Sequence, residues 1–476
     1  MGASPVAAAE RKAPLGRAVV LALLAMGLAV FVISNDISAM TVAVPDMERD
    51  LGATVGTVQW VINAYTLVFG VLIVTGGRLA DLLGRRRMFL VGSGVFAAFS
   101  LVGALAQDPW LLIAARALMG VGGALIWPAV VGLIFSIVPA GRAGLAGGLI
   151  LGVSGVGNAC GPLIGGLLTD VFDWRAILLL NLPVAAVAVL VTLRTVPADE
   201  TGARRERIDL PGVATLSLAL VALLVALDQA NEWGWGDWRI VVLLVVAVVL
   251  GAAFAATQHR AGDDVLIPRG VIANGRFRAA CLAMLLTSGI WFVAMLYAPQ
   301  FTQKVLGDDA LASGVALLPM MALFALTSFA AGPLYNTLGP RPLLIAGAAL
   351  MPIGIVLLSF LDAGSGYGAM VPGLVVIGLG AGFFYSTVTN AAITTLDGDQ
   401  ASLGSGILVM FQLVGGTIGI GLTTTIVLGV SDGAAAGAEF VDGLTAGFRV
   451  DAALGILGLI AAAAVVRRRV AARAGA

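Results

Sequence analysis

The sequence predicts an all-α polytopic membrane protein. Hydrophobic residues make up 59% of its 476 residues, charged residues only 11%, and the mean hydropathy is +1.02. Soluble domains carry about 25% charged residues, so this chain could not cover its own surface with polar groups in water. The composition therefore excludes a soluble globular enzyme, a disordered protein and a nucleic-acid-binding protein. It also excludes an outer-membrane barrel, because barrel strands alternate in polarity instead of running apolar for twenty residues.

Fourteen apolar stretches of about twenty residues give the predicted transmembrane helices. The first apolar run is too long for the core of a signal peptide, so we expect an uncleaved first span. The first seven predicted spans are 18–44, 56–77, 88–107, 110–135, 143–169, 176–193 and 210–227. The second seven are 240–257, 279–301, 310–331, 343–361, 368–394, 402–430 and 452–466.

The distribution of charge predicts that both ends of the chain are cytoplasmic. An even number of spans puts both ends on one side of the membrane, and basic loops stay in the cytoplasm. In this orientation the arginine-rich stretches at 85–87, 204–207 and 467–469 are all cytoplasmic, as are Arg11 and Lys12. Among the 27 basic residues only Lys12 and Lys304 are lysines, a bias typical of GC-rich bacterial genomes. We therefore expect a multi-pass protein of the bacterial cytoplasmic (inner) membrane.

An internal repeat divides the chain. After the second and the tenth span, two glycines stand seven residues apart and an arginine follows. Both loops are cytoplasmic, so the repeat is parallel, which is typical of transporters that bind substrate between two halves. The alternative is a chance pair of glycine turns. We expect two pseudo-symmetric six-helix bundles, 1–200 and 261–476, with two inserted transmembrane helices in 201–260. The matching pairs are Gly77 and Gly332, Asp81 and Asn336, Gly84 and Gly339, and Arg86 and Arg341.

Four motifs resemble those of the major facilitator superfamily, in the same order along the chain. The stretch from Asp36 to Pro45, with Trp174-Arg175 and Asn181 further on, resembles the fourteen-helix drug:proton antiporter family of multidrug efflux proteins. Residues 116–122, which begin at Arg116, resemble motif B. The positions that resemble motif A are Gly77, Asp81, Gly84, Arg85 and Arg86, and those that resemble motif C are Gly157, Gly161, Pro162, Gly165 and Gly166.

The resemblance covers nearly the whole chain and implies the major facilitator fold. It also implies that the motif A loop is a gating latch that stabilises the outward-open state, and that motif C belongs to an antiporter. From its chemistry, Asp81 can bridge to a helix N-terminus or to an arginine across the interface of the halves. Glycines four residues apart with Pro162 permit a smooth, kinked helix at that interface. Positive-inside anchoring explains the arginines, and ordinary packing explains many of the glycines, equally well.

Asp36 is the only acid within the predicted spans, and Arg116 is the only base. A buried charge in a membrane faces the protein interior or a wet cavity, and a carboxyl group that alternates between dry and wet surroundings can load and release a proton. The two residues lie at similar depth in antiparallel helices, so a pair is geometrically possible. We expect Asp36 and Arg116 to form the proton-coupling switch. The alternatives are a helix-end carboxylate that reaches the external surface and a purely structural ion pair.

Aromatic and amide side chains within the predicted spans are candidates for a substrate pocket. Aromatic faces suit flat or cationic lipophilic ligands. Taken singly, each such residue is more often part of the packing or of the interfacial belt. The candidate substrate-binding residues are Asn63, Tyr65, Trp127, Trp291, Tyr297, Phe384, Tyr385, Asn390 and Gln412.

The sequence lacks the motifs of an enzyme. No Walker-type Gly-Lys motif, metal-ligand spacing or nucleophile elbow is found, so we expect no catalytic residues, no metal and no cofactor. The sole histidine, His259, falls in a predicted cytoplasmic loop, which excludes a histidine proton relay within the membrane. Cys160 and Cys281 lie in apolar runs, so a disulfide framework is not expected.

These observations predict a secondary active transporter that exports lipophilic or cationic small molecules in exchange for protons, by alternating access. Its partners are a small-molecule substrate, protons and the lipid bilayer, with no nucleic acid, and a monomer is expected. Alternatives are an exporter of a lipid or a self-made antibiotic, and a non-transporting membrane sensor or scaffold. Because Asp36 is the only acid within a predicted span, we expect substrates that are at most monocationic.

Overall fold

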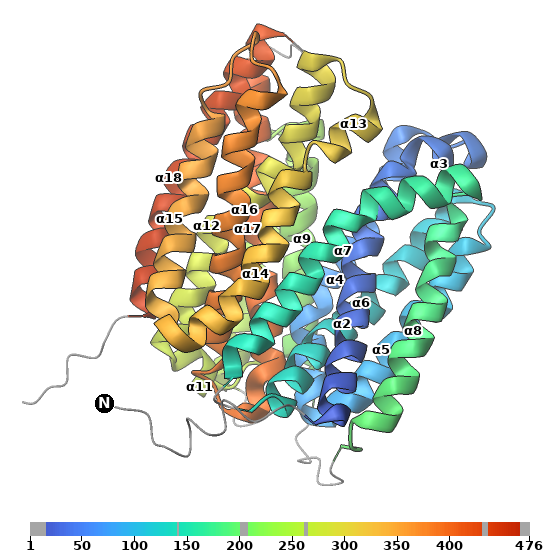
Figure 1. Ribbon diagram of the computed structural model, residues 1–476, viewed down its shortest axis with the longest axis vertical. Helices are drawn as coiled ribbons and strands as arrows, with labels where there is room; N and C mark the ends of the chain where they lie inside the picture. Colours follow the sequence, from blue (N-terminus) through green and yellow to red (C-terminus); the bar gives the residue numbers. More distant parts are fainter. Residues whose placement is uncertain (1–15, 140–141, 200–207, 261–264, 431–436, 467–476) are drawn as a thin grey trace, which may run out of the picture.

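The computed structural model is a bundle of long helices (Figure 1). It describes residues 16–139, 142–199, 208–260, 265–430 and 437–466. Within these ranges there are no strands, and fourteen helices are long and apolar enough to cross a membrane. The predicted number of spans is therefore confirmed. Arg11, Lys12 and the stretches at 204–207 and 467–469, which entered the charge argument, lie outside the described residues.

The first bundle comprises the helices before residue 200. Its spanning helices pack mainly on one another, α4 on α6, α5 on α6 and α2 on α7, and the short α3 lies at the outer end. Its elements are α2 (Arg17–Val42), α3 (Val44–Leu51), α4 (Val55–Leu83), α5 (Arg85–Ala104), α6 (Pro109–Ile137), α7 (Ala143–Val171) and α8 (Arg175–Thr195).

The second bundle comprises the helices after residue 265. Its closest pairs are α15 with α16, α12 with α17, and α14 with α16. The short α11 lies at the cytoplasmic end, and the π-helical turn η2 extends α12 outward. Its elements are α11 (Arg269–Ala273), α12 (Gly275–Phe301), η2 (Thr302–Leu306), α13 (Ala310–Val315), α14 (Leu318–Leu338), α15 (Pro340–Leu358), α16 (Tyr367–Ile393), η3 (Gly398–Gln400), α17 (Ala401–Val430) and α18 (Ala438–Val465).

The inserted helices α9 (Leu210–Trp233) and α10 (Trp238–Arg260) pack on each other as a hairpin. Only α9 makes extensive further contacts, with α4 of the first bundle and α17 of the second. The inserted pair therefore covers a seam between the bundles. His259 lies in the last turn of α10 and not in a loop as expected, because the helix runs on past its apolar window.

Polar caps set where several helices begin. The Thr54 hydroxyl accepts from the Thr57 backbone N–H at 3.3 Å at the start of α4, and an Asp108 carboxylate oxygen accepts from Leu111 at 2.9 Å at the start of α6. Asn274 does the same for α12. The first N–H groups of a helix have no partner within the helix, so a polar side chain next to an apolar run marks its N-terminus.

The repeat in the sequence is also a repeat in the packing. Gly84 (φ 106°) separates α4 from α5, and its counterpart Gly339 (φ 81°) separates α14 from α15. This left-handed backbone is open to glycine and strained for other residues. The helix before each turn crosses to the fifth spanning helix of the other bundle, since α4 packs on α17 and α14 packs on α7. The two bundles therefore exchange equivalent contacts, as pseudo-symmetry requires.

Several spanning helices are longer than predicted, and three of them correct the expectation that Asp36 is the only acid within a span. Arg78 of α4 and Arg449 of α18 likewise correct the expectation that Arg116 is the only base. Helix α4 runs on to Leu83, α9 to Trp233, and α18 begins at Ala438 and not at 452. These helices include Asp81, Asp228 and Asp451 respectively. The predicted span in α4 ended before Arg78, and those in α9 and α18 stopped at Asp228 and Asp451. Hydropathy does not register that a charged side chain can face a protein neighbour or a cavity.

Candidate functional site

Asp36 and Arg116 form a buried ion pair in the first bundle. Both side chains are fully buried, and Nη1 of Arg116 contacts Oδ2 of Asp36. The pair joins α2 to α6 in the interior of the bundle, away from lipid. Two buried opposite charges stabilise each other, whereas removal of one partner leaves a charge that the interior cannot solvate. The predicted pairing is therefore present in the structure.

Polar neighbours orient both partners. Nδ2 of Asn181 donates to Oδ1 of Asp36 at 2.8 Å and lies 3.0 Å from the Ser100 hydroxyl, which in turn donates to a carbonyl of α8. Nε of Arg116 donates to the Val61 carbonyl at 3.0 Å. The pair is thus connected to α4, α5 and α8, so a change in its protonation would be felt by five helices.

Tyr65, a predicted substrate contact, lies in this cluster. The guanidinium carbon of Arg116 lies 4.6 Å from the centre of the Tyr65 ring, and the ring stacks on Phe69 at 6.1 Å. Its side chain is fully buried, and no hydrogen-bond partner of its hydroxyl is found among the described residues. Tyr65 therefore acts as an apolar and cation–π support for Arg116.

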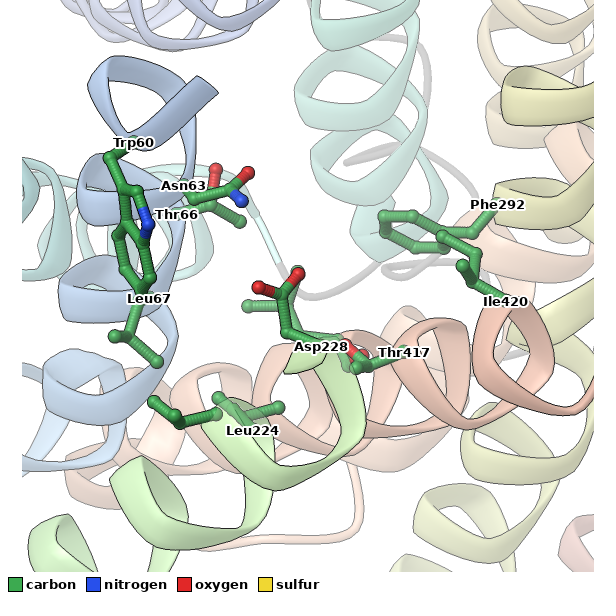
Figure 2. Close-up of a pocket in the computed structure, with 11 residues that line it drawn as sticks. Trp60, Asn63, Thr66, Leu67, Leu224, Asp228, Phe292, Thr417 and Ile420 are labelled. Carbon is green, nitrogen blue, oxygen red and sulfur yellow. The ribbon is translucent and has the colours of Figure 1, made fainter. Parts of the chain in front are cut away.

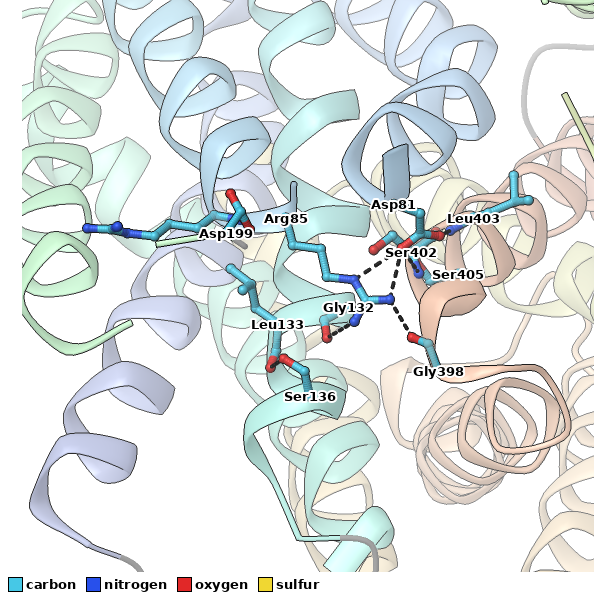
Figure 3. A network of polar contacts seen from close by, with 11 residues as sticks. Asp81, Arg85, Gly132, Leu133, Ser136, Asp199, Gly398, Ser402, Leu403 and Ser405 are labelled. Atoms are coloured by element: carbon cyan, nitrogen blue, oxygen red, sulfur yellow. Dashed lines mark hydrogen bonds and ion pairs between the residues drawn. The ribbon is translucent and has the colours of Figure 1, made fainter. Parts of the chain in front are cut away.

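The cytoplasmic ends of α4 and α17 are held by a charged latch (Figure 3). Oδ2 of Asp81 accepts from the Leu403 backbone N–H at 2.8 Å, and its Oδ1 accepts from Nη2 of Arg85 at 2.9 Å. Arg85 also donates to the carbonyls of Gly132 at 3.1 Å and Gly398 at 2.5 Å. A carboxylate at the N-terminus of α17 is favoured by the helix dipole. The latch therefore ties α4 and α6 of the first bundle to the second bundle.

The rest of motif A serves the same junction. Gly77 lies against α17 so closely that a Cβ atom there would be 2.6 Å from the Ser402 carbonyl oxygen. Nη2 of Arg86 donates to the Leu193 carbonyl at 3.0 Å, while the backbone N–H of Arg86 donates to Asp199 at 3.1 Å. Arg86 thus anchors α5 to the end of α8 within the first bundle, and Arg85 alone of these two arginines reaches the second bundle.

A second seal closes the cytoplasmic side between α7 and α14. A Cβ atom on Gly144 would lie 2.3 Å from the Gly332 carbonyl oxygen, so the two helices touch through their backbones. Asn390 of α16 accepts from the Gly147 backbone N–H at 3.1 Å across the same interface. Asn390, a predicted substrate contact, is therefore placed in the seal between the bundles.

We expect Gly144→Val to block closure of the cytoplasmic seal. A side chain there must push α7 and α14 apart, and overpacking of this kind costs about 1–3 kcal/mol. Transport should fall roughly tenfold, since a shift of 1.4 kcal/mol is a factor of ten in an equilibrium. The matched control is Gly94→Val on α5, where a Cβ atom would meet nothing within 4 Å. Efflux of a fluorescent dye from cells measures both; equal efflux would show that the contact is dispensable.

The motif C glycines do not lie at the interface between the bundles, where they were expected. Cβ atoms on Gly157, Gly161 and Gly165 would meet α2, at Phe31, Ser38 and Ala39, within the first bundle. The glycines of this helix that face the second bundle lie nearer its cytoplasmic end and are Gly144, Gly147, Gly148, Gly152 and Gly155. Helix α7 is therefore smooth on two faces, one for each bundle. Gly166 is half-buried five residues before the end of this helix.

The outer side of the molecule is open between the bundles. A cavity of about 310 Å³ lies between α2 and α7 on one side and α12 and α14 on the other. Figure 1 shows the bundles diverging toward this outer end, while the latch and the seal close the cytoplasmic end. The structure is therefore outward-facing. The cavity is lined by Ile37, Ser38, Thr41, Val42, Asn158, Ala159, Pro162, Met295, Leu296, Pro299, Gln303, Gly314, Leu317, Leu318 and Met321.

A smaller cavity of about 160 Å³ lies under the inserted helix α9 (Figure 2). Its walls come from all three parts of the chain: α4 from the first bundle, α12 and α17 from the second, and α9 itself. The predicted pocket residue Asn63 lines it. The lining residues are Trp60, Asn63, Thr66, Leu67, Leu224, Val225, Asp228, Phe292, Leu413, Thr417 and Ile420.

The other predicted pocket residues line neither cavity. Trp291 packs on Phe324 at 4.7 Å between ring centres, and Tyr385 packs edge-on against Trp291 at 6.4 Å and Phe384 at 5.3 Å. All four rings are buried, so this outward-facing state holds them as core of the second bundle. The remaining three are Tyr297, whose hydroxyl donates to Thr424 at 2.6 Å, half-buried Trp127, and half-buried Gln412 beside Tyr385.

A charged clamp at the outer end accounts for the Trp174-Arg175 motif. Nη1 of Arg175 lies 2.6 Å from Oδ2 of Asp50, and its guanidinium stacks 4.3 Å from the centre of the Trp174 ring. Nε1 of Trp174 donates to the same Asp50 oxygen at 3.3 Å. The hydrogen bond from Arg175 lowers the pKa of Asp50. The clamp therefore ties α3 to the start of α8 outside the membrane.

Asp451 is a buried acid that the sequence reasoning missed. It lies 13 residues into α18, about 20 Å along the helix, and is 1% exposed. The Thr423 hydroxyl donates to its Oδ2 at 2.5 Å, and its Oδ1 has no hydrogen-bond partner among the described residues. The signal available in the sequence was its place directly before the last predicted span, 452–466, since α18 in fact begins fourteen residues earlier.

Comparison with known proteins gives consistent matches along most of the chain. The model of the Major Facilitator Superfamily matches residues 26–420 and, in a second match, 280–475. A puromycin resistance protein of Streptomyces alboniger is 36% identical over 431 residues, which cover 88% of this chain and 85% of the relative. A tetracenomycin C resistance and export protein of Streptomyces glaucescens is 31% identical, with 88% and 77% covered. The crystal structure of the human organic anion transporter MFSD10 has the same fold, with a TM-score of 0.66 at 14% identity over 97% of this chain and 100% of that chain.

Proposed function

The chain belongs to the Major Facilitator Superfamily, and we propose that it exports lipophilic or cationic small molecules from the bacterial cytoplasm in exchange for protons. The observation that carries this proposal is the fully buried Asp36–Arg116 pair in a molecule whose outer cavity is lined in part by the next residues of α2, Ile37 and Ser38. The names of its relatives, which speak of resistance to and export of antibiotics, favour an antibiotic or a compound of similar size as the substrate. We place the protein in the inner membrane, as a monomer.

In the proposed cycle the two bundles, 1–200 and 261–476, rock about the substrate. The inserted helices α9 and α10 stay packed over the seam between the bundles. Substrate leaves through the outer cavity, and a proton from outside then reaches Asp36. Protonation removes the charge that Arg116 neutralises, so the guanidinium must find another partner and the helices around it shift. The Asp81 latch releases, the cytoplasmic side opens, and loss of the proton to the cytoplasm returns Asp36 to its pair.

An efflux assay with an uncoupler tests the proposed function. Cells that lack their own exporters are loaded with a panel of neutral and monocationic dyes, with and without expression of the protein. We expect expression to lower dye accumulation several-fold, and we expect a proton uncoupler to restore it. Accumulation that stays low in the presence of the uncoupler would contradict proton coupling, and unchanged accumulation of every dye and of puromycin would contradict export.

The rival function, a membrane sensor or scaffold without turnover, makes a different prediction in the purified protein. An exporter of the proposed kind should release protons into weakly buffered detergent solution when substrate binds, because substrate favours the ionised Asp36. A sensor that binds the same compound has no need to do so. Folded protein that binds a dye but releases no proton would favour the sensor.

A further inference from the structure

The cavity under α9 contains a carboxylate that the proposed cycle does not use. Asp228 lies five residues before the outer end of α9, about 8 Å along the helix. Figure 2 shows its carboxylate pointing into the cavity between Trp60 and Asn63 on one side and Phe292 on the other. The inserted helix thus brings a negative charge to a cavity whose other walls are aromatic, aliphatic and uncharged.

No cation of the protein neutralises this carboxylate within the described residues. None of the ion pairs found there involves Asp228, and its one described hydrogen bond comes from the neighbouring Gln229 amide at 2.8 Å. The nearest basic residue along the inserted pair, Arg239, lies over the rings of Trp233 and Trp238 at 5.3 and 5.9 Å. Asp36 differs in this respect, since Arg116 already neutralises its charge.

We propose that Asp228 receives the positive group of a monocationic lipophilic substrate, so that the inserted helix α9 supplies the charge selectivity of the transporter. This inference rests on the proposed function and adds to it a substrate class and a role for the inserted pair. One carboxylate in the cavity matches one positive charge. Trp60 and Phe292 offer the faces that attract organic cations, and Leu67, Leu224 and Ile420 offer apolar contact.

The position of the cavity suits a cation on its way out. It lies in the outer half of the membrane, at the seam of α4 and α17, and it is bounded by both bundles. A substrate held there contacts helices that separate when the bundles rock, so its affinity must differ between the two states. A carboxylate at this depth raises the local concentration of cations over neutral molecules, and salt screens this effect.

The test compares Asp228→Asn with the matched control Glu232→Gln. Glu232 is an exposed acid on the same helix, one turn further out, and does not line the cavity. Purified protein in lipid nanodiscs is titrated with ethidium, a fluorescent monocation, and with Nile red, a neutral lipophilic dye. We expect Asp228→Asn to weaken ethidium binding about fivefold and to leave Nile red binding unchanged. Glu232→Gln should leave both unchanged, and Asp228→Glu should keep ethidium binding.

The salt dependence of ethidium affinity distinguishes a charge contact from a structural role, because a structural role of Asp228 would not change it. Ethidium binding to the unaltered protein and to Glu232→Gln should weaken as salt rises from low to physiological concentration, and the slope should be flatter for Asp228→Asn. Equal ethidium affinity and equal salt slopes in Asp228→Asn and Glu232→Gln would overturn the proposal. A parallel loss of ethidium and Nile red binding in Asp228→Asn would also overturn it, because the side chain would then be supporting the fold.

The same variants separate this inference from the proposed function. Suppose that Asp228→Asn still exports Nile red, that an uncoupler abolishes this export, and that ethidium export falls. Then the proposed function and the role of Asp228 both stand. If all variants export ethidium equally, the role of Asp228 fails and proton-coupled export stands. If the unaltered protein exports neither dye and no other compound of the panel, the proposed function itself fails.

Discussion

Asp36→Asn should abolish proton-driven export. The amide keeps the shape of the carboxyl group and can still accept from Asn181, but it cannot exchange a proton. We expect the efflux rate in everted membrane vesicles, driven by an imposed pH gradient, to fall at least about a hundredfold, as befits the loss of an essential proton carrier. Downhill exchange of the dye across the same membrane should persist. The control is Asp46→Asn, an acid outside the membrane whose ion pair among the described residues is with Arg49, three residues further on.

A structural ion pair would also make this variant inactive, so a second variant is needed. Asp36→Asn alone leaves Arg116 buried without a counter-charge, which costs about 3–5 kcal/mol. The double variant Asp36→Asn with Arg116→Gln removes both charges and should recover most of that stability, measured as the thermal unfolding temperature. If the double variant folds well and still shows no response to a pH gradient, Asp36 carries the coupling. Recovery of gradient-driven export in the double variant would show that the pair is structural.

Asp81→Asn should open the cytoplasmic side. The amide can no longer hold Arg85 as an ion pair or accept as strongly from the N-terminus of α17. Loss of a charge-assisted hydrogen bond costs about 2 kcal/mol, so the ratio of outward-facing to inward-facing molecules should fall roughly thirtyfold. Export should drop in proportion, because the cycle stalls in the inward-facing state, while the stability of the fold changes little.

Spin labels on the cytoplasmic side measure this shift directly. Arg87 at the start of α5 and Arg341 at the start of α15 are exposed and lie on different bundles, so cysteines at these positions report the distance between the bundles. The native Cys160 and Cys281 are replaced by serine first. Double electron–electron resonance should show a longer distance between the two spin labels in Asp81→Asn than in the protein with an intact latch. Asp397→Asn, an exposed acid on the same side, is the control; the same distance distribution in all three proteins would refute the latch.

The pairing of Asp36 with Arg116 could be predicted from the sequence because charged residues within the predicted spans are rare and these two lie at similar depth in the membrane. Each was the only charge of its sign in the predicted spans, and antiparallel helices bring residues at equal depth together. The partner of Asp81 was not within reach. Its chemistry allowed a helix N-terminus or an arginine across the interface of the halves. The structure uses the N-terminus of α17, while the arginine that pairs with Asp81 is Arg85 of the same bundle. The choice of α17 depends on which helices cross at the cytoplasmic end.

The candidate pocket residues show what sequence patterns cannot predict, namely the neighbour that each face of a helix contacts. Tyr65 and Asn63 lie two residues apart on α4, yet Tyr65 supports Arg116 inside the first bundle while Asn63 lines the cavity under α9. Helical periodicity separates the faces of a helix but does not say which neighbour each face meets. The motif C glycines differ from expectation for the same reason, since close packing was predictable and the identity of the helix packed against them was not.

The sequence by itself determined the environment of this protein, because transfer of apolar and charged groups between water and lipid depends on residue type alone. That is why the number of spans and the parallel repeat can be predicted from the sequence. The tertiary structure decided what the remaining acids face. Asp228 and Asp451 each lie just beyond a predicted span, and hydropathy treats both as charges that end a helix. Only the packing of α9 against a seam, and of α18 against α12 and α17, shows that one faces a cavity and the other the protein interior.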